Sequence, residues 1–181
     1  MAVDIHSHDA NWAALRVSAA ASVPSNYAKM GTAVGSDAVE AGTTDTVITA
    51  TGHSAAVGDE IVMTSGGEDG EAREVTAVTA NTITLEAALS GTPSATETFN
   101  ILRPVQNHAT VPGRIVVIKS TLDTGVFLSF DGSADHLYIE GGDDLVLDLK
   151  KNGLHLDREG YIYVKEDSTP SSGSLYVSVV R

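Results

Sequence analysis

The sequence contains no cysteine, and it is poor in aromatic and basic residues. Without a thiol, disulfides, thiolate metal sites and cysteine nucleophiles are excluded. The chain has 11 Lys and Arg against 24 Asp and Glu, a formal net charge of -13. This balance argues against direct nucleic-acid binding, because counterion release requires basic side chains on the protein. No apolar run approaches the roughly 20 residues of a membrane span, and no N-terminal stretch has the pattern of a signal peptide.

The length and the distribution of charge divide the chain. At 181 residues it can form one domain or two small ones. Residues 1–33 carry two basic and two acidic side chains, and residues 34–103 carry two basic against 11 acidic ones. Residues 114–181 carry seven basic against 11 acidic ones. The pattern predicts a neutral leader, a strongly acidic middle and a milder C-terminal part, whose acidic surfaces face solvent and repel nucleic acid.

Residues 1–42 predict an extended N-terminal arm. The segment is rich in Ala, Ser, Val and Gly, and it has too little apolar area to fold alone. We expect it to lie across a neighbouring molecule, with Trp12 and Tyr27 as anchors, because large aromatic side chains carry much of the energy of such contacts. The alternative is a disordered tail.

Residues 43–103 predict a small SH3-like β-barrel module. Short runs rich in β-branched residues alternate with turns that contain Gly, Asn or Pro. The expected strands cover 46–50, 60–64, 73–78, 82–86 and 97–102. Strands of about five residues in so short a segment are typical of a small barrel. Pro104 and Pro112 bracket an uncharged linker at 104–112.

Residues 113–181 predict a jelly-roll-like β-sandwich, so that the whole chain is all-β. Apolar and polar residues alternate, and burying one apolar face per strand requires two sheets packed face to face. The expected strands cover 114–119, 125–130, 136–140, 144–149, 161–164 and 174–180. The expected core side chains are Ile115, Val117, Val126, Leu128, Phe130, Leu137, Ile139, Leu145, Leu147, Leu149, Ile162, Val164, Leu175, Val177 and Val179.

No set of residues indicates catalysis, so we expect no enzyme, no cofactor and no metal. His6 and His8 resemble the start of a metal hydrolase, but such sites need further ligands from later barrel strands. The acidic turns lack the ligand spacing of a calcium loop, and no nucleophile or phosphate-binding motif is present. Four tyrosines of the sandwich offer an alternative, a sugar-binding platform: Tyr138, Tyr161, Tyr163 and Tyr176.

Two segments resemble β-modules that recur in virion proteins of tailed bacteriophages. The first runs from Thr51-Gly-His-Ser through Val57-Gly-Asp-Glu-Ile61 and the hairpin at 75–85 to Phe99-Asn-Ile-Leu-Arg-Pro104. The second runs from Gly125-Val-Phe-Leu-Ser-Phe-Asp-Gly132 to Ser172-Gly-Ser-Leu-Tyr-Val177.

The resemblance implies a non-enzymatic structural subunit of a phage particle. It favours a homo-oligomeric capsid decoration or cement protein that binds the major capsid protein. The alternatives are a head–tail neck, connector or tail protein, and a carbohydrate- or receptor-binding module. The expected interface residues are Trp12, Tyr27, Tyr138 and Tyr176.

Overall fold

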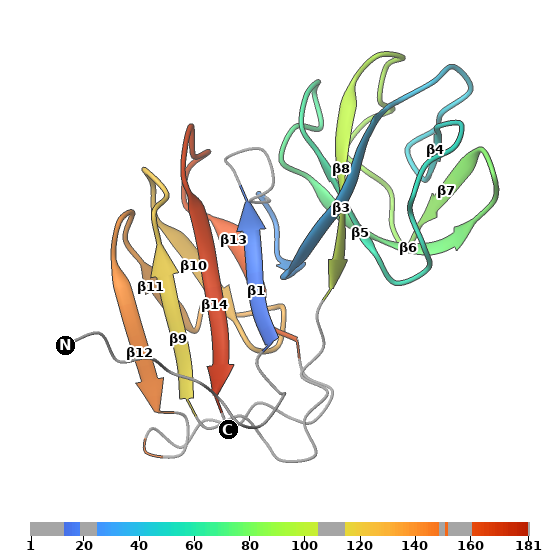
Figure 1. The fold of residues 1–181 in the computed structure, drawn as a ribbon. Coiled ribbons are helices and arrows are strands. Elements are labelled where there is room, and N and C mark those ends of the chain that lie inside the picture. The colour runs from blue at the N-terminus through green and yellow to red at the C-terminus, as the bar shows by residue number, and fades with distance from the viewer. Residues whose placement is uncertain (1–12, 19–24, 105–114, 149–150, 152–160, 181) are drawn as a thin grey trace.

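The computed structural model describes residues 13–18, 25–104, 115–148, 151 and 161–180. The fold is all-β, and the described residues form three antiparallel sheets. Two of these sheets form a two-layered sandwich, at the left of Figure 1, and the third, with six strands, lies at the upper right. No helix that could cross a membrane occurs among the described residues.

The sandwich consists of two four-stranded sheets. The first has the order β1-β14-β9-β12, formed by Ala13–Ser18 (β1), Ser174–Val180 (β14), Ile115–Ser120 (β9) and Asp144–Asp148 (β12). The second has the order β11-β10-β13-β2, formed by Leu137–Ile139 (β11), Val126–Ser129 (β10), Tyr163–Glu166 (β13) and Ala28–Lys29 (β2). The strands predicted from residue 114 onward are therefore present, with boundaries shifted by one or two residues.

The core of the sandwich lies between these two sheets. Its fully buried members include Met30, Leu128 and Val164. On β9 the buried apolar residues are Val116 and Ile118, so the prediction of Ile115 and Val117 was wrong by one residue. The run 115–118 is entirely apolar and carries no alternation, so only the packing partner decides which face is buried.

The third sheet has the order β3-β8-β5-β6-β7-β4. Its strands are Gly31–Ala38 (β3), Thr98–Pro104 (β8), Glu60–Met63 (β5), Ala72–Val78 (β6), Thr82–Leu85 (β7) and Val47–Thr49 (β4). The largest buried side chain is Phe99, packed with Ile48, Ile61 and Ile83. The sheet is not closed into a barrel, because β3 and β4 each pair with one neighbour only. The expected closure of this module was therefore wrong.

The predicted arm contributes strands to all three sheets. β1 pairs with β14 over its whole length, and β2 pairs with β13. β3 pairs with β8 and forms an edge of the six-stranded sheet. The chain therefore passes from sandwich to sheet at Met30 and Gly31, and the change of unit does not fall at residue 42. Weakly apolar segments such as these become strands because longer strands already present a free edge to pair with.

Candidate functional site

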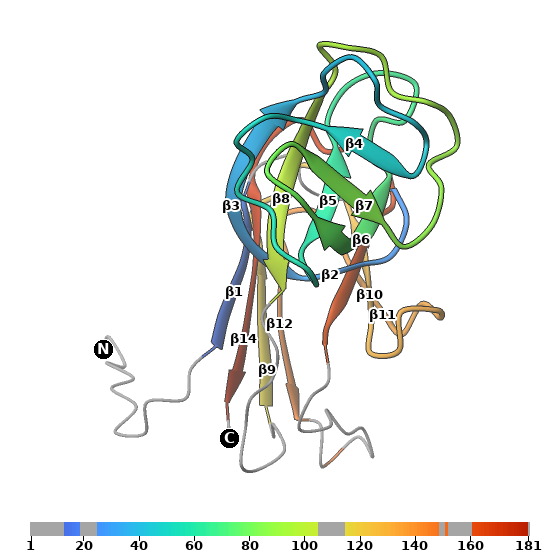
Figure 2. The same cartoon turned by 90° about the vertical axis from the view of Figure 1, so that its right-hand side faces the viewer.

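The junction between the sandwich and the six-stranded sheet contains a buried carboxylate, Glu60. Figure 2 shows the six-stranded sheet from its outer side, with the sandwich strands extending below it. β2 lies at the edge of the sandwich next to this sheet. Its Lys29 reaches across to Glu60 of β5 and Glu74 of β6. The Lys29 Nζ to Glu60 Oε1 distance is 3.9 Å, and Lys29 Nζ also forms an ion pair with Glu74.

Hydrogen bonds also join the residues just before β2, Ser25 and Asn26, to the start of β6 and the turn before it. The Asn26 side chain pairs with the backbone of Ala72 as a strand residue would. Its Oδ1 accepts from the Ala72 N–H at 2.7 Å, and its Nδ2 donates to the Ala72 carbonyl at 3.1 Å. The Ser25 N–H donates to the Gly70 carbonyl at 2.6 Å. These bonds satisfy polar groups that the junction would otherwise leave buried and unpaired.

A small apolar cluster completes the junction. Ala28 of β2 packs against Val62, Ala72 and Leu102 from three strands of the six-stranded sheet. All four side chains are buried. The ion pairs of Lys29, the hydrogen bonds of Asn26 and the apolar contacts of Ala28 thus lie side by side. Together they join the sandwich to the six-stranded sheet.

Beside this cluster lies a cavity of about 440 Å³. Its charged lining carries four carboxylates and two basic groups, so it is acidic. Its lining residues are Asn26, Tyr27, Lys29, Glu60, Ala72, Arg73, Glu74, Glu86, Ala87, Asp131, Gly132 and Tyr163.

The electrostatics of the cavity centre on Glu60. Burial raises the pKa of Glu60 to about 7. The attraction of Lys29 lowers that pKa but does not outweigh burial, and the neighbouring charges of Glu74 and Glu86 raise it further. Burial lowers the pKa of Lys29, but its bond to Glu74 and the charge of Glu60 outweigh this and leave the pKa raised.

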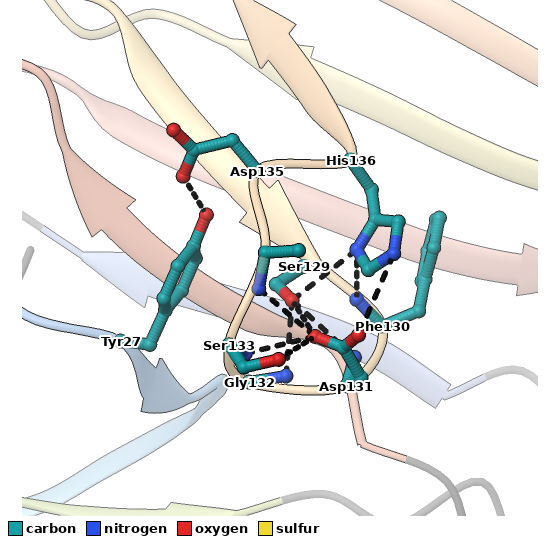
Figure 3. Close-up of polar contacts among 9 residues, drawn as sticks. Tyr27, Ser129, Phe130, Asp131, Gly132, Ser133, Asp135 and His136 are labelled. Carbon is teal, nitrogen blue, oxygen red and sulfur yellow. Dashed lines mark hydrogen bonds and ion pairs between the residues drawn. The ribbon is translucent and has the colours of Figure 1, made fainter.

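The turn after β10 forms one rim of the cavity. Asp131 Oδ1 accepts bonds from the N–H groups of Ser133 at 2.8 Å and Ala134 at 3.0 Å, and from the Ser129 hydroxyl at 2.9 Å. These bonds hold the pKa of Asp131 well below its usual range. Figure 3 shows that they all lie within the turn. Asp131 is therefore a structural residue of the turn.

The same turn binds the segment before β2. The Tyr27 hydroxyl donates to Asp135, as Figure 3 shows. Lys165 of β13 also contacts Asp135, at 2.9 Å, and its Nζ lies 4.7 Å from the centre of the Tyr27 ring. Burial and the bond to Asp135 raise the pKa of Tyr27. Tyr27 thus contacts its own chain, where it holds the edge segment against the sandwich.

An aromatic row continues from Lys165 across the outer face of this sheet. Lys165 pairs in register with Phe127 of β10, which pairs with Tyr138 of β11. The Lys165 Nζ lies 4.9 Å from the Phe127 ring, and the Phe127 and Tyr138 ring centres are 5.1 Å apart. The Tyr138 hydroxyl donates to Asp167 at 3.3 Å. We call Tyr27, Lys165, Phe127 and Tyr138 the aromatic row.

The structure separates the interface residues predicted from the sequence. Tyr138 is 47% exposed on the β11-β10-β13-β2 sheet, whereas Tyr176 is 36% exposed on the β1-β14-β9-β12 sheet. Tyr161 and Tyr163 lie beside the junction, 6.4 Å apart. One sugar platform of all four tyrosines is therefore not formed. Trp12, His6, His8 and the linker beyond Pro104 lie outside the described residues.

Sequence reasoning missed the junction residues Lys29, Glu60 and Glu74. A signal was present, because Lys29 is the only basic residue between Arg16 and Arg73. Which of the many carboxylates pairs with this lysine depends on which strands meet.

The chain matches no known family model, no curated protein and no solved structure. In the part of the chain that the structure describes, no group of three or more His, Asp or Glu side chains is arranged to hold a metal ion. The functional argument therefore rests on the geometry of the junction and of the outer sheet faces.

Proposed function

We propose that this protein is a structural subunit of a tailed-phage virion, a capsid decoration protein that binds the major capsid protein in many copies. The two segments that resemble virion modules supply the strands of separate folded units. Residues 51–104 contain β5 to β8 of the six-stranded sheet, and residues 125–177 contain β10 to β13 and the first half of β14. Each resembling segment thus lies within one of the two folded units, and this supports the proposal.

The observation that supports docking to a partner is the aromatic row on the outer face of the β11-β10-β13-β2 sheet. Tyr138 is 47% exposed, yet its ring is held by Phe127 and its hydroxyl by Asp167. A large aromatic side chain that is ordered before binding loses little conformational entropy on docking. Such a side chain suits contact with a neighbouring protein surface.

The test uses particles of the phage that encodes the chain, assembled without this protein and then supplied with purified variants. We expect particles without the protein to lose resistance to heat and osmotic shock, and added wild-type protein to restore it. Tyr138→Ala is expected to weaken binding at least tenfold. Val146→Ala, at an exposed position of the other sandwich sheet, is the control. Unchanged resistance without the protein would refute the cementing role.

The number of copies per particle distinguishes a shell protein from a neck protein. A shell protein occurs in roughly hundreds of copies and a neck ring in about six or twelve, because each follows the symmetry of its site. A count near six or twelve would contradict the decoration role and favour the neck or connector role.

A further inference from the structure

Two carboxylates of the six-stranded sheet share one lysine of the sandwich. Glu60 and Glu74 are directly opposite each other on β5 and β6, and both contact Lys29 of β2. Glu60 is buried, with 5% of its surface exposed. When both carboxylates are ionised, the junction holds one negative charge more than Lys29 balances. Because Glu60 is buried, its charge is poorly hydrated.

The remaining charged groups near Glu60 do not supply a second cation. Arg73 of β6 is bonded to Glu71 at 2.8 Å, and β8 presents the apolar Leu102 opposite Glu60. The titratable and charged groups that face Glu60 or line its cavity are Tyr27, Lys29, Arg73, Glu74, Glu86, Asp131, Tyr161 and Tyr163. Acidic groups outnumber basic ones, so ionisation of Glu60 is opposed.

We propose that this junction is a pH-dependent coupling between the sandwich and the six-stranded sheet, tight when Glu60 is protonated and weaker when Glu60 and Glu74 are both ionised. The coupling rests on β2, which pairs with β13 of the sandwich while its Lys29 side chain contacts Glu60 and Glu74 and its Ala28 side chain packs against the six-stranded sheet. It does not depend on the proposed function.

The pH range follows from the burial of Glu60. Its pKa is raised from 4.5 to about 7 in the folded protein, so between these values the closed junction binds more protons than the open one. Stability of the closed junction is therefore full below pH 4.5 and declines as the pH rises through about 7. The linkage relation gives a roughly 30-fold increase in the opening equilibrium from about pH 5.5 to about pH 8.5.

Hydrogen exchange of the full chain tests the coupling. Protection factors, corrected for the intrinsic pH dependence of exchange, are measured for peptides covering β2, β5 and β6 at about pH 5.5 and about pH 8.5. We expect protection in the wild type to fall roughly 30-fold at the higher pH. Glu60→Gln keeps the size and polarity of the side chain but cannot ionise, so it is expected to abolish this fall.

Two further variants separate the coupling from a general effect of pH. Glu140→Gln, an exposed residue beyond β11 at the opposite edge of the sheet from β2, should retain the wild-type fall. Glu74→Gln leaves Lys29 to Glu60 alone, so the midpoint of the fall should move to lower pH. The proposal is overturned if the wild type changes by less than about threefold, if Glu60→Gln retains the fall, or if Glu74→Gln leaves the midpoint unchanged.

Discussion

Arg103 on β8 neutralises a buried carboxylate, and replacing it tests how the six-stranded sheet is stabilised. Arg103 Nε donates to Asp59 Oδ1 at 3.0 Å and Nη2 donates to Oδ2 at 2.9 Å. The Asp59 side chain is 3% exposed, whereas that of Arg103 is 51% exposed. Arg103→Met leaves Asp59 with the Ala56 N–H, at 2.9 Å, as its remaining described donor.

The expected cost follows from this geometry. Removing one partner of a fully buried ion pair costs about 3–5 kcal/mol. The outer half of the guanidinium is exposed, so water replaces part of its contribution and solvent screens the pair. We therefore expect Arg103→Met to lower the free energy of unfolding by about 2 kcal/mol, measured by urea denaturation followed by far-UV circular dichroism.

Two controls make the measurement decisive. Lys119→Met breaks a 3.7 Å pair with Asp144 in which both side chains are more than half exposed, so its cost should stay below about 0.5 kcal/mol. Asp59→Asn added to Arg103→Met removes the unbalanced charge and should restore about 1 kcal/mol. A loss below about 0.5 kcal/mol for Arg103→Met, or strict additivity in the double variant, would refute the reasoning.

Three substitutions test the packing that joins the units and shapes the turn. Met30 is 1% exposed in the sandwich core, so Met30→Ala should cost about 3 kcal/mol in urea denaturation, and a cost below about 1 kcal/mol would contradict its burial. A Cβ at Gly31 would collide with the backbone carbonyl of Arg103, so Gly31→Ala should reduce hydrogen-exchange protection in β3 and β8. Unchanged protection would show that the two strands can move apart without loss of pairing. Ser129 is fully buried, and its hydroxyl donates to Asp131 and accepts from the Gly132 N–H. Ser129→Ala should therefore lower the free energy of unfolding by about 1–2 kcal/mol, and a smaller loss would show that the turn forms without these bonds.

Local sequence patterns were sufficient to place most strands. Turn residues and β-branched runs located β5, β6 and β7 within one or two residues, because strand boundaries here are marked by Gly, Asn and Asp. The segment at 31–38 has Gly31, Gly35 and Asp37 within it and few large apolar residues, so its sequence predicts an arm and not a strand. Its pairing with β8 includes a register shift between Ala33 and Gly35, which no periodic pattern indicates.

The sequence alone determined that this chain is all-β, that it lacks thiol chemistry, and that its middle part is strongly acidic. These properties depend on composition and on alternation between neighbouring residues, which the chain carries locally. The tertiary structure decided that Lys29 meets Glu60 and Glu74, that Met30 fills the sandwich core, and that Tyr138 lies on the sheet opposite that of Tyr176. Each of these facts depends on which distant strands pair and in which register, because pairing fixes the face on which every side chain lies.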